Sequence, residues 1–255
     1  RESLIMKAIF KYHPLFEASI IDPMHTSVGG LPNESVSIEG GDFLVAKEDV
    51  FIVGTGIRTS TQGIDFIIEN LQNRKNGVYQ VIVQELPSSP ESFIHLDMVF
   101  TILDVDTCMV YKPIILESNK HHTIKITIEG GRVTRITEYT NILEALKTLG
   151  IELKPVSCGG DEDSWIQERE QWHSGANFLA FEPGKVIGYA RNSNTVEELH
   201  KNGFEVLAAG EIIKGKVNPS DFNKCVITIE GSELARGGGG ARCMTMPVRR
   251  AGVRW

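Results

Sequence analysis

A recurring order of strands and helices is the feature that most limits how this 255-residue chain can fold. Residues 42–60 are typical of two short strands joined by a turn, and residues 177–193 repeat that pattern. Each pair precedes a helical stretch, a glycine at the expected helix end (Gly77 or Gly203) and a further strand. This order predicts an α/β fold of repeated strand–strand–helix–strand units around a common centre. A doubly wound sheet without a shared site stays open as the alternative.

Other segments extend this reading of the chain. Residues 140–157 predict a helix ending at Gly150 and then a strand, which gives a partial third unit. Residues 1–13 predict a helix, and residues 204–210 predict the strand that follows the helix of their unit. Residues 211–226 show no alternation of their own, so we expect a surface loop there.

Charge and cysteine content narrow the possible classes of protein. The chain has 26 basic and 33 acidic residues, a net charge of −7, which argues against broad binding to nucleic acid or anionic lipid. No apolar run approaches the ~18 residues that a membrane span needs. The four cysteines lack CxxC spacing, which favours a reducing compartment over a disulfide scaffold. We therefore expect a cytoplasmic protein that binds neither nucleic acid nor membranes.

The strongest chemical signal is the glycine-rich run before Cys243. Four glycines at 237–240 let the backbone approach a ligand closely. Arg236 and Arg242 flank the cysteine and favour its thiolate, which attacks electrophilic carbon. The local sequence also allows a buried, inert cysteine at a glycine-rich turn.

Carboxylates and one histidine form the second signal. His95 and Asp97 are two residues apart in an expected strand, which would put both on one face. Two glycines separate Glu39 from Asp42, so both acids can turn toward one point. With a thiol, these groups suit a planar cation such as a guanidinium, and histidine moves protons near neutral pH. A metal site built from these four residues is the competing interpretation, and an ordinary acidic turn with a surface histidine is the plainest one.

Several strings together resemble the arginine deiminases. They are "EGGD", "HLDMVFT", "REQW" followed by "GAN" and "RN", and "GSELARGGGGARCMTMP", in an order that spans nearly the whole chain. The resemblance implies a pentein fold, an α/β-propeller of five ββαβ units around a pseudo-fivefold axis. It also implies one catalytic domain over residues 1–255 that is incomplete on its N-terminal side, lacking an upstream unit and a helical insertion.

The resemblance implies hydrolysis of L-arginine to L-citrulline and ammonia through a covalent thiouronium intermediate. On this basis Cys243 is the nucleophile and His95 the acid and base. Glu39 and Asp97 are catalytic carboxylates that hold the guanidinium. No metal or organic cofactor is implied.

The resemblance also implies substrate-binding roles. Asp97 and Asp42 face the guanidinium, and Arg58 holds the substrate α-carboxylate. The family has an arginine where this chain has Gly238, so this substrate-positioning arginine is expected to be either supplied by Arg236 or absent.

Two alternatives remain for the function. The family's upstream Arg-Asp-Pro segment with a further catalytic aspartate is not in this sequence, so we expect these 255 residues alone to be inactive, as a fragment or non-catalytic remnant. The other alternative is a related amidinotransferase or methylarginine hydrolase. The expected partners are L-arginine and further copies of the chain in a homo-oligomer.

Overall fold

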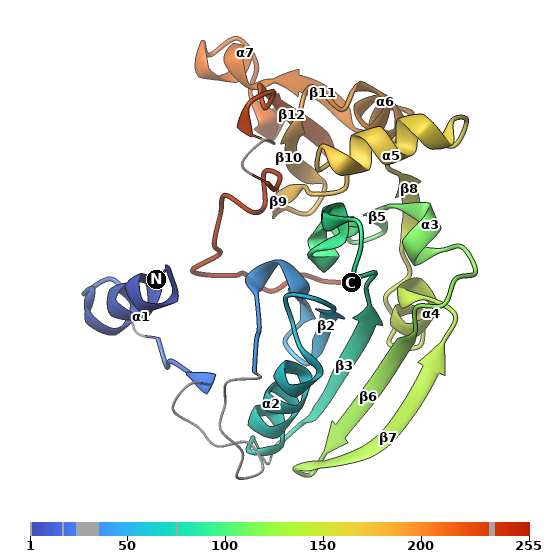
Figure 1. The fold of residues 1–255 in the computed structure, drawn as a ribbon. Coiled ribbons are helices and arrows are strands. Elements are labelled where there is room, and N and C mark those ends of the chain that lie inside the picture. Colours follow the sequence, from blue (N-terminus) through green and yellow to red (C-terminus); the bar gives the residue numbers. More distant parts are fainter. Residues whose placement is uncertain (1, 17, 24–35, 75, 235–237) are drawn as a thin grey trace.

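The computed structural model describes residues 2–16, 18–23, 36–74, 76–234 and 238–255. Within this part of the chain the fold is mixed α/β, with three β-sheets of five, four and three strands. Helix α1 (Glu2–Tyr12) confirms the predicted N-terminal helix and lies apart from the sheets (Figure 1). None of the described helices is long and apolar enough to cross a membrane.

The first unit has the predicted order of elements. Strands β1 (Phe43–Lys47) and β2 (Val50–Thr55) form an antiparallel hairpin. Helix α2 (Thr61–Gln72) begins after Ser60, whose hydroxyl accepts a hydrogen bond from the Gly63 amide. Strand β3 (Val78–Glu85) then returns parallel to β2. The unit is therefore a hairpin followed by a helical crossover, which places β3 parallel to the second strand of the hairpin.

The second unit is complete, whereas the sequence predicted only its helix and last strand. Strands β4 (Phe100–Asp104) and β5 (Thr107–Val110) form its hairpin, and short helix α3 (Lys112–Ile115) follows. Helix α4 (Ile142–Lys147) and strand β8 (Lys154–Ser157) complete it, with β8 parallel to β5.

A hairpin inserted between its two helices interrupts the second unit, so the repeat was only partly recognised in the sequence. Strands β6 (Thr123–Glu129) and β7 (Arg132–Tyr139) lie between α3 and α4 in the chain. They do not join their own unit. Instead β6 pairs antiparallel with β3, so the first sheet has the order β1-β2-β3-β6-β7.

The third unit follows helix α5 (Ser164–Trp172) and corrects one prediction. Strands β9 (Leu179–Glu182) and β10 (Lys185–Tyr189) form the hairpin, and helix α6 (Ser193–Lys201) and strand β11 (Glu205–Ala208) follow. The strand next to β10 is not β11, however, but β12 (Cys225–Ile229), which lies between them. Residues 211–226 are thus not all loop, because they include most of helix α7 (Ala209–Ile213) and the start of β12.

Apolar clusters join neighbouring units and fix the loops between them. One cluster includes Ile52 and Ile82 of the first unit with Phe100 and Ile142 of the second. Another includes Leu103 of the second unit with residues of the third. Because the units pack against one another, the segments that precede β1 and follow β3 and β12 are held on a rigid scaffold. Closure of such units into a fivefold ring remains a prediction.

Candidate active site

Glu39 and His95 meet where two short turns come together. Gly40–Asp42 form a 3₁₀ turn just before β1, and Leu96–Met98 form another just before β4. His95 Nε2 lies 2.6 Å from Glu39 Oε2. Gly41 makes this approach possible, because a Cβ atom there would lie 2.7 Å from the His95 ring. The predicted strand at 95–97, which would put His95 and Asp97 on one face, is therefore wrong, because His95 immediately precedes a 3₁₀ turn that contains Asp97.

Asp42 supports the second turn from within the protein. Its side chain is 1% exposed; Oδ1 accepts the Leu96 amide at 2.8 Å, and Oδ2 accepts the Thr59 hydroxyl at 2.6 Å. Burial raises the pKa of Asp42 to about 6, partly opposed by these hydrogen bonds. Both oxygens already have protein donors, so direct contact between Asp42 and a substrate remains a prediction.

Arg58 lies beside the same turns. Its guanidinium Nη1 is 3.5 Å from Glu39 Oε1, and its side chain is half exposed. Glu39 thus lies between a guanidinium and the His95 imidazole. Arg236, the other predicted substrate-binding arginine, lies outside the described residues.

Asp97 is a buried carboxylate with spare capacity to accept hydrogen bonds. It is 1% exposed, and its Oδ2 lies 3.7 Å from Arg242 Nε. Its Oδ1 is shielded from solvent and has no hydrogen-bond partner among the described residues. Burial raises the pKa of Asp97, and the charges of Arg242 and His95 partly oppose this. A buried acceptor of this kind is suited to a ligand that brings N–H donors.

Cys243 lies at the end of the glycine-rich loop and next to Asp97. The other three cysteines are buried, whereas Cys243 is exposed. Gly239 has φ +112°, and a Cβ there would lie 2.8 Å from the Cys243 Cβ, so this position requires a glycine. Burial of the sulfur raises the pKa of Cys243 and the charge of Asp97 adds to the rise, while Asn177 and Arg242 oppose it.

The structure thus brings Glu39, Asp42, Arg58, His95 and Asp97 together, and links Asp97 to Cys243. It also adds Asn177, which sequence reasoning assigned no role. No group of three or more His, Cys, Asp or Glu residues within the described ranges is arranged to hold a metal ion.

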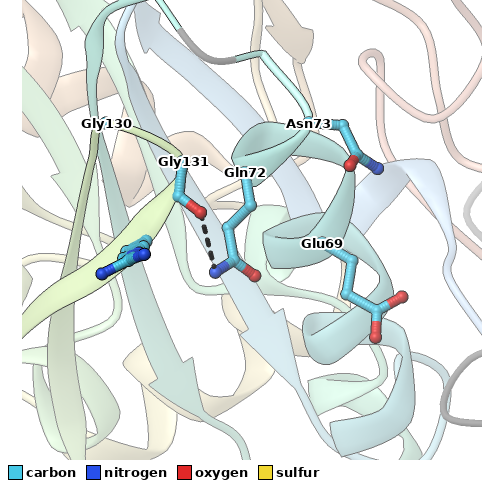
Figure 2. Close-up of a pocket in the computed structure, with 6 residues that line it drawn as sticks. Glu69, Gln72, Asn73, Gly130 and Gly131 are labelled. Atoms are coloured by element: carbon cyan, nitrogen blue, oxygen red, sulfur yellow. Dashed lines mark hydrogen bonds between the residues drawn. The ribbon is translucent and has the colours of Figure 1, made fainter.

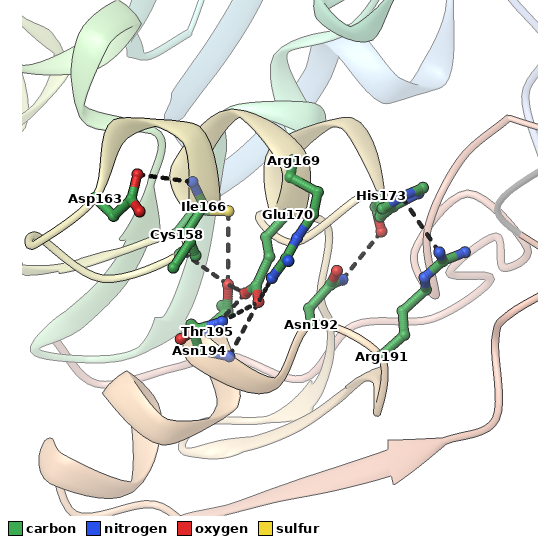
Figure 3. A network of polar contacts seen from close by, with 11 residues as sticks. Cys158, Asp163, Ile166, Arg169, Glu170, His173, Arg191, Asn192, Asn194 and Thr195 are labelled. Carbon is green, nitrogen blue, oxygen red and sulfur yellow. Dashed lines mark hydrogen bonds and ion pairs between the residues drawn. The ribbon is translucent and has the colours of Figure 1, made fainter.

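The "REQW" and "RN" strings serve a different purpose, shown in Figure 3. Glu170 is 1% exposed and accepts hydrogen bonds from the amides and side chains of Asn194 and Thr195, at 2.7–3.0 Å. It therefore anchors the first turn of α6. Arg191 lies 3.2 Å from His173 Nε2, and Asn192 donates to the His173 carbonyl.

Two hollows elsewhere on the surface share no residue with this cluster. Figure 2 shows one of about 570 Å³, lined by Glu69, Gln72, Asn73 and the β6–β7 turn, where Gln72 donates to the Gly131 carbonyl. The other, of about 1260 Å³, lies between α2 and strands β3 and β6 and is largely apolar.

Comparison with known proteins gives a consistent result. The arginine deiminase family profile matches residues 1–250. The arginine deiminases of Bacillus cereus and Bacillus cytotoxicus are 37% and 35% identical to this chain. Each match covers 99% of this chain and 56% of the relative. The chain therefore spans little more than half the length of these relatives.

Solved structures show the same kind of fold. The N-terminal domain of ArgZ, an arginine dihydrolase from cyanobacteria, matches with a TM-score of 0.51 and 18% identity over 86% of this chain and 59% of that one. SxtG, an amidinotransferase from Microseira wollei, matches with a TM-score of 0.52 and 15% identity over 99% of this chain and 62% of that one. At these identities the likeness concerns the fold alone.

Fold and site define a mixed α/β protein in which a thiol, an imidazole and buried carboxylates lie in one connected cluster. The family match makes this assignment specific. The chain belongs to the arginine deiminase family.

Proposed function

We propose that this cluster carries the hydrolysis of L-arginine to L-citrulline and ammonia, with Cys243 as the nucleophile. The supporting observation is the buried Oδ1 of Asp97, which has no hydrogen-bond partner among the described residues and lies near the surface residue Cys243. A guanidinium offers N–H donors in a planar fork that suits such a carboxylate. Its central carbon would then lie near the cysteine sulfur.

The proposed chemistry balances in two steps. The Cys243 thiolate attacks the guanidinium carbon and forms a C–S bond; one C–N bond breaks, and ammonia leaves with a proton from His95. Water then gives a proton to His95 and adds to the same carbon. The C–S bond breaks as the added hydroxyl passes its proton to the released ammonia through solvent, which gives citrulline and ammonium and restores the thiolate. Glu39, 2.6 Å from His95 Nε2, would orient the imidazole as well as the substrate.

Charged groups at the edge of the site would select the substrate. Arg58 is half exposed, and among the residues that the structure describes its guanidinium forms an ion pair only with Glu39, at 3.5 Å, so it could also pair with an α-carboxylate. Asp42 would act through the Leu96 amide by fixing the turn that carries Asp97. For Arg236, substrate binding stays a prediction from the sequence.

The assembly around this chemistry is also proposed. We infer one pentein-type catalytic domain over residues 1–255, acting in the cytoplasm within a homo-oligomer. Because the chain covers 56% of its relatives' length, turnover belongs to the whole protein in this proposal. The test on these 255 residues therefore measures one alkylation of Cys243, which does not require turnover.

Alkylation of Cys243 provides that test. Chloroacetamidine carries a planar amidinium, whereas chloroacetamide is its neutral counterpart. If carboxylates hold a guanidinium beside the thiol, the folded protein should favour the cationic reagent by at least about tenfold more than the urea-unfolded protein does. Asp97→Asn should lower that preference, and Asp106→Asn, a change at an exposed carboxylate, should leave it. Equal preference in folded and unfolded protein contradicts the proposal.

Turnover distinguishes the proposed reaction from related ones. With isotope-labelled arginine, citrulline formation that persists in Cys243→Ala would contradict the mechanism. Faster reaction with monomethylarginine would favour a methylarginine hydrolase instead. Transfer of the amidino group to an added amine would favour an amidinotransferase.

A further inference from the structure

Asn177 connects the two halves of the candidate site. It is 1% exposed and lies in the segment between α5 and β9. Its Nδ2 donates to the Cys243 sulfur at 3.2 Å and to the Asp97 carbonyl at 3.2 Å. Its Oδ1 accepts the Arg242 amide at 3.0 Å. One amide thus uses both its donors and its acceptor to tie the cysteine loop to the turn that carries Asp97.

The glycine-rich loop is shaped around this amide. A Cβ atom at Gly240 would lie 2.5 Å from Asn177 Oδ1 and 2.6 Å from its Cβ. Only a residue without a side chain can follow this path while Asn177 stays in place. This gives the last glycine of the run a specific role, which is to admit the Asn177 side chain.

The backbone of Asn177 is itself fixed from two sides. Its amide donates to the Ser174 carbonyl at 3.1 Å, and the Thr101 hydroxyl donates to the neighbouring Ala176 carbonyl at 2.8 Å. Ser174 has φ +61°, which is uncommon for a residue other than glycine. The Gly175 amide donates to the Glu170 carbonyl at 2.7 Å, which links this loop to the network of Figure 3. A strained loop held this firmly indicates a constrained position for the side chain that follows.

We propose that Asn177 is a positioning residue, which holds the Cys243 sulfur in a fixed geometry relative to Asp97 and stabilises its thiolate. This rests on the proposed function only in taking Cys243 as the nucleophile. An N–H donor favours a thiolate over a thiol, because the charged acceptor forms the stronger hydrogen bond. Burial and the charge of Asp97 raise the Cys243 pKa, whereas the Gly240 backbone amide, the Asn177 side chain and the Arg242 charge lower it.

The pH dependence of Cys243 alkylation by neutral iodoacetamide tests this proposal without arginine or turnover. Only Cys243 is exposed among the four cysteines, and peptide mass spectrometry confirms the labelled site. Asn177→Ala and Asn177→Asp should raise the midpoint of the alkylation profile by about one pH unit, a tenfold smaller thiolate fraction at neutral pH. Asn177→Asp keeps the acceptor for the Arg242 amide but replaces the donor with a negative charge beside the sulfur, so its midpoint should rise at least as far as that of Asn177→Ala.

Asn192 supplies the matched control. It is also a buried asparagine that donates to a backbone carbonyl, that of His173, but it has no contact with Cys243. Asn192→Ala should leave the midpoint unchanged. If Asn177→Ala has the wild-type midpoint, or if Asn192→Ala shifts it equally, the proposal is wrong.

Gly240→Ala keeps the test decisive if Asn177→Ala does not fold by circular dichroism. This variant retains the Asn177 side chain but displaces it from the sulfur, together with the Gly240 backbone amide that also lowers the Cys243 pKa, so it should raise the midpoint; a wild-type midpoint would overturn the proposal. The iodoacetamide profile tests the role of Asn177 independently of the proposed function. A chain that shows no preference for chloroacetamidine, yet loses thiolate in Asn177→Ala, would refute arginine chemistry and retain the role of Asn177.

Discussion

Asp42→Asn should change how the stability of the protein depends on pH. Burial raises the pKa of Asp42 from 3.8 to about 6, so the folded state binds this proton more tightly than the unfolded chain. Its stabilising contribution is therefore complete below about pH 3.8 and is lost as pH rises through about 6. At 1.36 kcal/mol per pKa unit, the ionised carboxylate costs about 3 kcal/mol at neutral pH relative to the protonated one.

An amide of the same shape avoids this cost. Its oxygen can still accept the Leu96 amide, and its NH₂ group can donate to the Thr59 hydroxyl. Relative to the wild type, Asp42→Asn should therefore gain about 3 kcal/mol in free energy of unfolding between about pH 4 and about pH 7. Urea denaturation followed by circular dichroism at several pH values in this range measures the difference.

The control variant, Asp106→Asn, should change the pH dependence of stability in the opposite direction. Lys224 lowers the pKa of the exposed Asp106, so that ion pair stabilises the fold above the ordinary aspartate pKa and is lost as pH falls. Asp106→Asn should show a small effect of that sign, because the pair is solvated. A stability difference between Asp42→Asn and wild type that stays constant across the pH range would refute the reasoning.

Two further changes test the packing around the site. Gly188→Ala places a Cβ 2.3 Å from the Phe178 ring and should lower the free energy of unfolding by about 1–3 kcal/mol in urea, whereas Gly210→Ala, with nothing within 4 Å in helix α7, should not lower it. Glu170→Gln replaces one oxygen of a buried carboxylate, which accepts four hydrogen bonds, with an NH₂ group that cannot accept them. It should lower the free energy of unfolding by about 1.5–3 kcal/mol. Exposed Glu168→Gln should stay within about 0.5 kcal/mol of wild type, and equal losses in the two glutamate variants would contradict the anchoring role.

The local sequence pattern was sufficient to predict the strands and the helix of the first unit. Alternation, the Ser60 cap and the glycine with φ +131° at Gly77 all act within a few residues, so the sequence predicts β1, β2, α2 and β3 correctly. Strand pairing depends on distant partners instead. Nothing local in residues 225–229 indicates that β12 inserts between β10 and β11.

The site shows the same division. Residue types and glycines led to the prediction of which side chains carry chemistry, and five of the predicted residues meet in space. The secondary structure at His95 was mispredicted, because the Asp42 carboxylate captures the Leu96 amide and holds a turn where the sequence suggests a strand. Asn177 stands in the "GAN" string, but its role could not be read from the local sequence, since its three side-chain contacts come from segments 65–80 residues away.

The inserted hairpin β6–β7 affects how the chain folds as well as what it builds. The chain leaves the second unit after α3, adds two strands to the first sheet and returns through α4 to finish the second. The β3–β6 pairing therefore ties the middle of the second unit to the sheet of the first. The two units should open as one cooperative block in native-state hydrogen exchange, with β3 and β8 amides sharing the same opening free energy. Any protein engineered by excising or swapping a single unit would have to carry this hairpin with its acceptor sheet.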